Sequence, residues 1–154
     1  GWIFDNKKSR HVALLSTKAW VLTGGATAVL KQLAHRQRPN EGAAPDPYFW
    51  KGPFALTSDF TSFPSGHSST AFAVATVIAG SYPDKWWIGT LSYGVATLTG
   101  LSRMYDNKHW ASDVFTGALL GWWIGRSLLK SHPSIQWGAS VGSRHATGSF
   151  VYRF

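Results

Sequence analysis

The sequence predicts a mainly α-helical protein, a bundle of helices that ends in a short β-hairpin. Two observations carry this prediction: apolar residues recur at helical spacing in four segments, and apolar residues alternate with others only near the C-terminus. A length of 154 residues suits one domain. We therefore expect residues 1–154 to form a single domain, with a helical core over about residues 11–130 and a tail over residues 131–154.

The first helix is predicted over residues 11–36, where leucines such as Leu15, Leu22 and Leu30 lie near helical spacing. Pro39 disfavours helical backbone at the residue before it, so the helix should end there. Residues 40–63 then form a loop that is longer than most connections in compact domains. Because this loop carries six aromatic side chains, we expect it to be a lid or a pocket wall. They are Tyr48, Phe49, Trp50, Phe54, Phe60 and Phe63.

Three further helices are predicted, over residues 65–79, 86–101 and 111–130. In the last of them, Gly117, Gly121 and Gly125 recur every four residues and therefore lie on one face. Glycine lowers the stability of a helix, so such a stripe needs a packing reason. We expect this face to make a close contact with another helix, as small residues do between membrane helices and in tight soluble bundles.

The tail is predicted to form a β-hairpin from residues 134–141 and 145–154. Phe150, Tyr152 and Phe154 recur at every second position, as the side chains on one face of a strand do. A single hairpin cannot close a barrel, so we expect a ribbon that packs on the helices.

Charge and composition narrow the classes of partner. The chain has 15 Lys or Arg residues against seven Asp or Glu, a net charge of +8, but its cations are scattered rather than gathered in runs. Nucleic-acid backbones are usually bound by clustered cations, so we expect no nucleic-acid partner and favour one small anionic ligand. The absence of cysteine excludes disulfides, thiol catalysis and Cys-ligated metals.

The apolar segments are weak candidates for membrane spans. A span needs about 20 mostly apolar residues, and these segments are shorter or carry many small polar residues. The mean hydropathy of the chain is also close to zero. These features favour a soluble or membrane-associated domain. Residue 1 is Gly rather than Met, so we expect the chain to begin after a cleaved or omitted segment.

Three clusters of residues fit the chemistry of a phosphate site, and the first is Lys31 with Arg38. Seven residues are about two helical turns, so both cations project from the same side near the helix end. Arginine presents a planar fork to phosphate oxygens, and lysine presents a mobile point charge. Taken alone, such a pair is more often part of a solvated helix face.

The second cluster runs from Pro64 to His67, directly before an apolar helical segment. A Ser–Gly turn at a helix N-terminus offers free backbone N–H groups and the positive end of the helix dipole to an anion. Ser65 adds a hydroxyl donor, Gly66 permits close backbone approach, and His67 can donate a proton. The alternative is an ordinary N-cap by Ser65 or Ser68, with His67 exposed.

The third cluster runs from Ser102 to Asp113 and includes Arg103 and His109. His109 and Asp113 are four residues apart, one helical turn, so the carboxylate can accept a hydrogen bond from one imidazole nitrogen. The other nitrogen is then left as a nucleophile with a free lone pair. Arg103 supplies another guanidinium for phosphate oxygens. Taken singly, a structural link at the start of a helix is the simpler explanation of the pair.

Together the three clusters resemble the type 2 phosphatidic acid phosphatase (PAP2) superfamily, which is related to bacterial class A acid phosphatases and vanadium haloperoxidases. The family pattern K-xxxxxx-RP matches Lys31 to Pro39, PSGH matches residues 64–67, and SR-xxxxx-H-xxx-D matches Ser102 to Asp113. The resemblance covers about residues 15–130 and implies a helical bundle of the PAP2/haloperoxidase type. It does not explain the tail, and the family core normally has further N-terminal helices.

The resemblance implies a role for each matched residue. His109 would attack phosphorus and become a phosphohistidine, and Asp113 would orient it. His67 would protonate the leaving alcohol and then activate the water that cleaves the intermediate. The expected ligands of the non-reacting oxygens are Lys31, Arg38, Ser65, Gly66 and Arg103. No metal or other cofactor is implied, in agreement with the absence of a carboxylate cluster near the motifs.

The implied activity is metal-independent hydrolysis of phosphate monoesters, above all of lipid phosphates or diphosphates, because the aromatic loop suits a substrate with an apolar part. The implied setting is a bacterial cell envelope, either periplasmic or membrane-associated with a site that faces the periplasm. Three alternatives stay open: a soluble periplasmic acid phosphatase of broad specificity, a vanadate-binding haloperoxidase, and a non-enzymatic module that binds anionic lipid. Haloperoxidases are much larger than this chain, which disfavours the second alternative.

Overall fold

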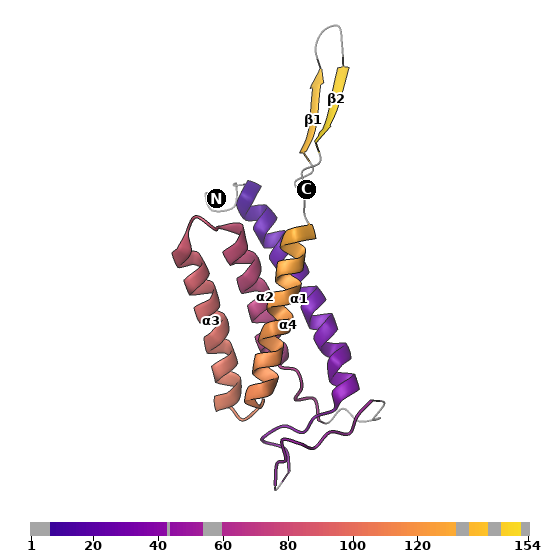
Figure 1. Cartoon of the computed structure of the whole chain (residues 1–154), viewed down its shortest axis with the longest axis vertical. Helices are drawn as coiled ribbons and strands as arrows, with labels where there is room; N and C mark the ends of the chain where they lie inside the picture. Colours follow the sequence, from indigo (N-terminus) through magenta and orange to yellow (C-terminus); the bar gives the residue numbers. More distant parts are fainter. Residues whose placement is uncertain (1–6, 43, 54–59, 132–135, 142–145, 152–154) are drawn as a thin grey trace.

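The computed structural model describes residues 7–42, 44–53, 60–131, 136–141 and 146–151, the last two ranges for the backbone alone. Helices make up most of the described chain, which confirms the predicted helical bundle (Figure 1). They are α1 (Lys7–Ala34), α2 (Gly66–Ser81), α3 (Trp86–Tyr105) and α4 (Ala111–Ser131). The loop that follows α1 lies at the same end of the bundle as the connection between α3 and α4 (Figure 1).

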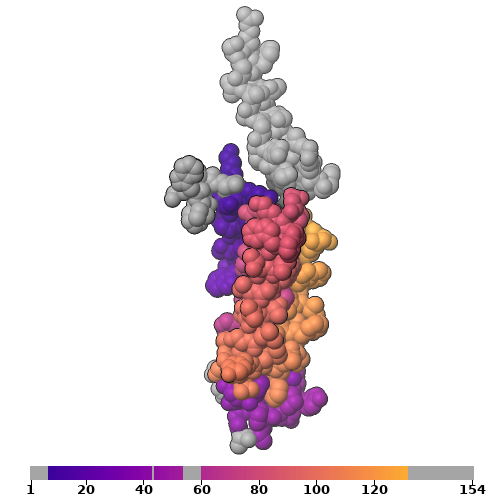
Figure 2. Space-filling model, turned by 90° about the vertical axis from the view of Figure 1, so that its left-hand side faces the viewer, coloured from indigo at the N-terminus to yellow at the C-terminus, as the bar shows by residue number. Residues whose placement is uncertain are grey.

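Helix α2 lies at the centre of the bundle. It contacts α1, α3 and α4, whereas α1 and α3 do not contact each other within the described residues. Figure 2 views the bundle from the α3 side and shows α1, in indigo, and α4, in orange, on opposite flanks of α3. Helix α4 therefore covers one face of α2, and another face of α2 lies between α1 and α3.

The glycine stripe of α4 packs against the backbone at α2, as predicted. A Cβ atom on Gly121 would lie 2.0 Å from the backbone oxygen of Ser69. A Cβ atom on Gly117 or Gly125 would lie 2.6 or 2.7 Å from another backbone oxygen of the same segment. Atoms cannot approach so closely without overlap, so only glycine permits this contact. The stripe therefore brings two helix backbones together.

The buried apolar core is small, and buried hydroxyl groups supplement it. Its centre consists of Leu15, Ala19, Ala73 and Val77. Between α1 and α2, the hydroxyl oxygens of Thr27 and Ser69 lie 2.8 Å apart in a buried hydrogen bond. Small residues and hydrogen-bonded hydroxyls at helix contacts are typical of bundles in apolar surroundings.

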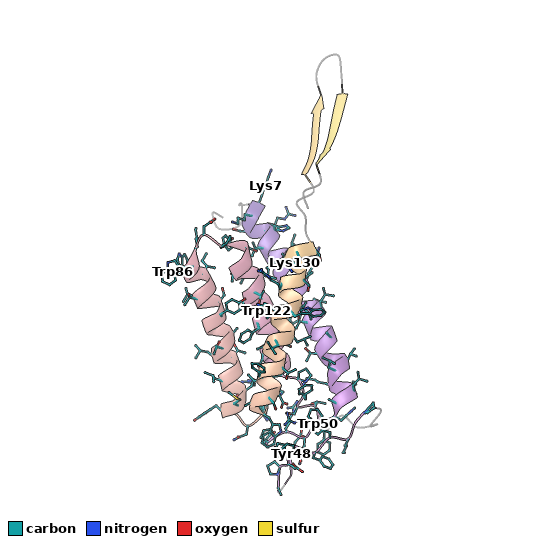
Figure 3. All side chains as sticks on the ribbon, viewed as in Figure 1. Lys7, Tyr48, Trp50, Trp86, Trp122 and Lys130 are labelled. Atoms are coloured by element: carbon teal, nitrogen blue, oxygen red, sulfur yellow. The ribbon has the colours of Figure 1, made fainter. Side chains whose placement is uncertain are left out.

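Large apolar side chains cover much of the outer surface of the bundle. They stand mainly on α1, α3 and α4, and Figure 3 shows one of them, Trp86, pointing away from the helices. Further examples are Trp20, Val29, Leu98, Phe115 and Trp123. Contiguous exposed apolar surface marks contact with lipid or with another protein. Of the described helices, α1 alone is long and apolar enough to cross a membrane.

Two strands lie in the tail where a hairpin was predicted. Strand β1 (Gln136–Val141) pairs antiparallel with β2 (Ala146–Val151), with Gln136 opposite Val151. In Figure 1 the pair extends beyond the end of α4, and neither strand contacts a described helix. The expectation that this ribbon packs on the bundle is therefore wrong for the part of the tail that the structure describes.

Candidate active site

The three motif clusters meet at the end of the bundle where α1 ends and where α2 and α4 begin (Figure 1). A pocket of about 530 Å³, which we call the anion pocket, opens there. Six predicted site residues line it, namely Lys31, Arg38, Gly66, His67, Arg103 and His109. The other two, Ser65 and Asp113, are fully buried and do not line it.

Cationic side chains dominate the charge of the anion pocket. Its lining contains Lys31, Arg38, Arg103 and Lys108, and no acidic side chain among the described residues. Lys31 donates a hydrogen bond from Nζ to the backbone oxygen of Thr61, and Arg38 donates to the hydroxyl of the same residue at 2.8 Å. Two cations from the first motif are therefore held by one residue of the long loop.

The two guanidinium groups of the pocket are each anchored through one nitrogen. Nη2 of Arg103 lies 2.7 Å from Oδ2 of Asp106, and Nη2 of Arg38 contacts Thr61. Nε of Arg38 lies 3.8 Å from a carboxylate oxygen of Glu41, too far for a hydrogen bond. In the described chain, the Nε atoms of both arginines are buried without a hydrogen-bond partner. Buried donors normally have an acceptor, so these groups fit a site that an anion completes.

The N-terminus of α2 forms one wall of the anion pocket. Ser65 is the N-cap of α2, and its hydroxyl oxygen accepts from the backbone nitrogen of Ser68 at 3.4 Å and from the hydroxyl of Ser68 at 2.9 Å. The first N–H groups of a helix need such a partner, so the capping role left open by the sequence is the one observed for this side chain. Gly66 and His67 in the first turn do line the pocket, where the helix dipole favours negative charge.

His109 is buried, and its tautomer follows from one hydrogen bond. Its Nδ1 lies 2.7 Å from the backbone oxygen of Ser62. A carbonyl oxygen only accepts, so Nδ1 carries the hydrogen and Nε2 keeps a lone pair. Burial, together with the positive charge of Lys31, lowers the pKa of His109 from its usual 6.5 to about 3. The imidazole is therefore neutral near pH 7.

Asp113 does not hold His109 in the way that its spacing predicted. Its Oδ2 lies 3.9 Å from Nδ1 of His109, beyond hydrogen-bond distance, because that nitrogen already donates to Ser62. The carboxylate accepts instead from the hydroxyl of Ser62 and from the backbone nitrogen of Trp110 at 2.9 Å, and it pairs with Arg36. The predicted direct hydrogen bond is wrong, and the connection between the two residues runs through Ser62.

Arg36 and Ser62 are parts of the site that the sequence did not predict. The buried guanidinium of Arg36 pairs with Asp113, and its Cζ lies 4.9 Å from the ring centre of Trp50 and 5.8 Å from that of Trp110. The backbone oxygen of Arg36 accepts from the nitrogen of Ser62 at 3.0 Å. The sequence signal is an arginine two residues before the arginine of the first motif, and this spacing does not distinguish a buried ion pair from a pocket cation.

The aromatic loop supports the site from outside the anion pocket. Trp50 stacks on Arg36 and packs edge to face against Phe63, with ring centres 5.2 Å apart. Figure 3 shows Tyr48 and Trp50 at the end of the bundle opposite Lys7. None of the described aromatic residues of the loop lines the anion pocket. The prediction of a pocket wall is wrong for them, and Phe54 lies outside the described residues.

The part of the chain that carries the three motifs is similar to known proteins. Residues 12–137 match the family model described as the PAP2 superfamily. The chain belongs to the PAP2 superfamily. The matched PAP2 region contains all three motif clusters and every residue of the anion pocket.

The relatives with named activities are longer than this PAP2 chain. It is 48% identical over 65 residues to a lipid A 1-phosphatase of Porphyromonas gingivalis, which covers 42% of this chain and 15% of that protein. It is 30% identical over 142 residues to a PA-phosphatase related-family protein of Dictyostelium discoideum, covering 81% of this chain and 51% of the relative. It is 40% identical over 63 residues to an undecaprenyl-diphosphatase of Sulfolobus acidocaldarius, covering 41% of this chain and 30% of that protein. The chain thus spans about half of these relatives or less, and no solved structure matches it.

Proposed function

We propose that this PAP2 protein is a metal-independent phosphatase that hydrolyses lipid phosphates or diphosphates through a phosphohistidine intermediate. The observation that carries the proposal is the state of His109, a buried neutral imidazole whose Nδ1–H bonds to Ser62 in a pocket lined by cations. A lone pair beside a cage of cations suits attack on phosphorus, because the cations stabilise the charge on the phosphoryl oxygens.

The reaction has two steps. In the first, Nε2 of His109 attacks phosphorus, the bond from phosphorus to the leaving oxygen breaks, and protonated His67 gives its proton to that oxygen. In the second, His67 takes a proton from water, the water oxygen attacks phosphorus, and the phosphorus–nitrogen bond breaks. Phosphate leaves, and both imidazoles return to their first state. The non-reacting oxygens are held by Lys31, Arg38, Arg103 and the N–H groups at the start of α2.

The support for a lipid substrate comes from relatives and from the surface of the bundle. Two of the relatives are named for a lipid A phosphate and for undecaprenyl diphosphate. We place the bundle in a lipid bilayer, with the anion pocket near one membrane surface. Helix α1 is long and apolar enough for a span, whereas α3 meets the requirement in length alone, with 20 residues for a hydrocarbon core of about 30 Å. The exposed apolar side chains would then contact acyl chains. A bacterial envelope with the pocket on the periplasmic side is the setting that the resemblance implies.

The test is a hydrolysis assay of the full chain in detergent and EDTA, with phosphatidate and p-nitrophenyl phosphate as substrates. We expect the unmodified protein to release phosphate from both and His109→Ala to fall to background. His11→Ala, in the N-terminal part of α1 and outside the lining of the anion pocket, serves as the matched control and should keep full activity. Turnover that disappears with EDTA contradicts the metal-free mechanism. Salt-dependent binding to anionic vesicles without any turnover supports the non-enzymatic module instead.

A further inference from the structure

A second cavity adjoins the anion pocket along α2. It has a volume of about 550 Å³ and is lined by α2 and α3, with Trp20 of α1 at its edge. Trp20, His67 and Thr70 line both cavities, so the two share a border. We call the second cavity the apolar groove, because its lining contains Val74, Ile78, Leu91 and Val95, and among the described residues His67 is its one ionisable side chain.

The apolar groove follows from the packing of the four helices. Helices α1 and α3 both contact α2 but not each other, so a strip of α2 is left between them. His67, Val74 and Ile78 recur at helical spacing along this strip. The strip lies on the side of α2 away from α4, since Val74 is about 140° around the helix from Ser69, which contacts the glycine stripe. Leu91 and Val95 of α3 are 61% and 64% exposed, so the groove opens along α3.

We propose that the apolar groove binds the hydrocarbon chain of the lipid substrate, on the leaving-group side of the bond that is cleaved. This inference rests on the proposed function, in which His67 protonates the leaving oxygen. Because His67 lines both cavities, that oxygen lies at their border, and the group attached to it extends into the groove. The occupant is a hydrocarbon, since the lining is mainly apolar, its hydroxyls are limited to Thr70, Ser92 and Thr99, and no described Lys or Arg lines it to hold a second headgroup.

The length of the groove should also limit the length of the hydrocarbon chain that it binds. At roughly 1.5 Å per residue, Val74 lies about 10 Å and Ile78 about 16 Å from His67 along the axis of α2. A short chain reaches only the level of Val74, and a longer chain reaches Ile78. A large side chain at either position therefore shortens the groove by a different amount.

The test compares kcat/KM for a long-chain and a short-chain phosphatidate in the same detergent. In Val74→Phe the ratio of the long-chain to the short-chain value should fall at least about tenfold, or about 1.4 kcal/mol. Ile78→Phe should lower the ratio only for chains long enough to reach it. The matched control is Val21→Phe, on the exposed side of α1 and outside both cavities, which should leave the ratio unchanged. An unchanged ratio in both groove variants overturns the proposal.

A measurement that needs no turnover separates this proposal from the proposed function. A phosphatidate with a photoreactive group near the end of its acyl chain is bound to the full-length His109→Ala variant and cross-linked by light. We expect mass spectrometry to place the cross-links on the α2 and α3 segments that contain Ile78 and Leu91. Cross-links spread over the outer faces of α1 and α4 overturn the proposal. A groove that is not cross-linked because a protein segment occupies it overturns the proposal as well. If the unmodified chain hydrolyses no phosphate and the cross-links still fall in the groove, the groove is supported and the proposed phosphatase activity is contradicted.

Discussion

The backbone oxygen of Ser62 accepts the hydrogen bond from Nδ1 of His109 at 2.7 Å, whereas the carboxylate of Asp113 stops 3.9 Å from the same nitrogen. Ser62 in turn donates its hydroxyl to Asp113 and its N–H to the backbone oxygen of Arg36. A carbonyl oxygen fixes the tautomer of an imidazole, as a carboxylate would. It stabilises the protonated ring less than a carboxylate does, because it carries no full negative charge. Ser62 thus orients His109, whereas burial and the positive charge of Lys31 lower its pKa and keep the ring neutral.

The protonation of His109 should be visible by NMR. The pKa is lowered to about 3 by burial and by Lys31, so the ring nitrogens should keep the neutral Nδ1–H pattern as the pH falls from 6.5 to about 3. An imidazole titration of the purified protein in detergent measures this directly. A His109 signal that titrates at or above 6.5 contradicts the buried, cation-flanked environment assigned to this ring.

The same shift makes folding stability depend on pH. The unfolded chain binds a proton on His109 below its usual pKa of 6.5, and the folded chain binds it only near 3. Between these values the unfolded state holds more protons, so stability should fall as the pH is lowered through this window. Thermal unfolding across the window checks the slope. His109→Gln, whose side chain cannot be protonated, should reduce the dependence of stability on pH. An equal dependence in both proteins contradicts His109 as its cause.

The role of His67 predicts a dependence on the leaving group. His67→Ala should slow hydrolysis of an alkyl phosphate by roughly 10²–10⁴, because an alkoxide needs a proton to leave. It should slow the phosphorylation step with p-nitrophenyl phosphate much less, since p-nitrophenolate leaves without one. Radiolabelled phosphate should then accumulate on His109, because the base for the second step is also absent. Equal losses for both substrates in a single-turnover experiment contradict the assignment.

The buried ion pair of Arg36 and Asp113 should be important for folding. The two side chains are 8% and 0% exposed, so Arg36→Ala leaves a buried carboxylate without its cation and should destabilise the protein by about 3–5 kcal/mol. Arg10→Ala on the exposed surface of α1 is the control and should change stability by less than about 0.5 kcal/mol. The double variant Arg36→Met with Asp113→Leu removes both charges and should lose less than the single variant. Unfolding in denaturant measures all three, and a larger loss in the double variant contradicts the explanation.

The close contact of α2 and α4 gives a matched pair of glycine variants. A Cβ on Gly121 would lie 2.0 Å from the backbone oxygen of Ser69, so Gly121→Ala should destabilise the protein by about 1–3 kcal/mol or more. No atom lies within 4 Å of a Cβ on Gly94 of α3, so Gly94→Ala should stabilise the helix by up to about 1 kcal/mol. The two midpoints of thermal unfolding should therefore move in opposite directions. If both variants shift the midpoint in the same direction, the explanation that the close contact requires glycine at position 121 is contradicted.

Local signals were sufficient to predict the helices, and the three motifs taken together predicted most of the residues that line the pocket. The helix over residues 111–130 carried both its apolar periodicity and its glycine stripe, and the structure has α4 at Ala111–Ser131 with that stripe on α2. The clusters around Lys31, His67 and His109 were recognisable because together they match the three-part pattern of the PAP2 superfamily, whereas each cluster alone has a simpler structural explanation. Those side chains line a common pocket.

The contacts that the sequence did not predict depend on the main chain or on tertiary packing. The partner of His109 is a backbone oxygen of Ser62, and a backbone group leaves no mark on the sequence. The burial of Arg36 depends on Trp50 and Trp110, which come from two separate loops. The apolar groove requires that α1 and α3 stay apart, and no pattern within either helix encodes that separation.

The backbone contact between α2 and α4 also bears on the placement of the two histidines of the site. Gly121 lets the two helices touch, and the N–H of Ser65 donates to the backbone oxygen of Asp113 at 3.0 Å where both helices begin. His67 lies in the first turn of α2, and His109 lies just before α4, so the two imidazoles are carried by two helices whose backbones touch. A change in the separation of the two rings would therefore require these two backbones to come apart.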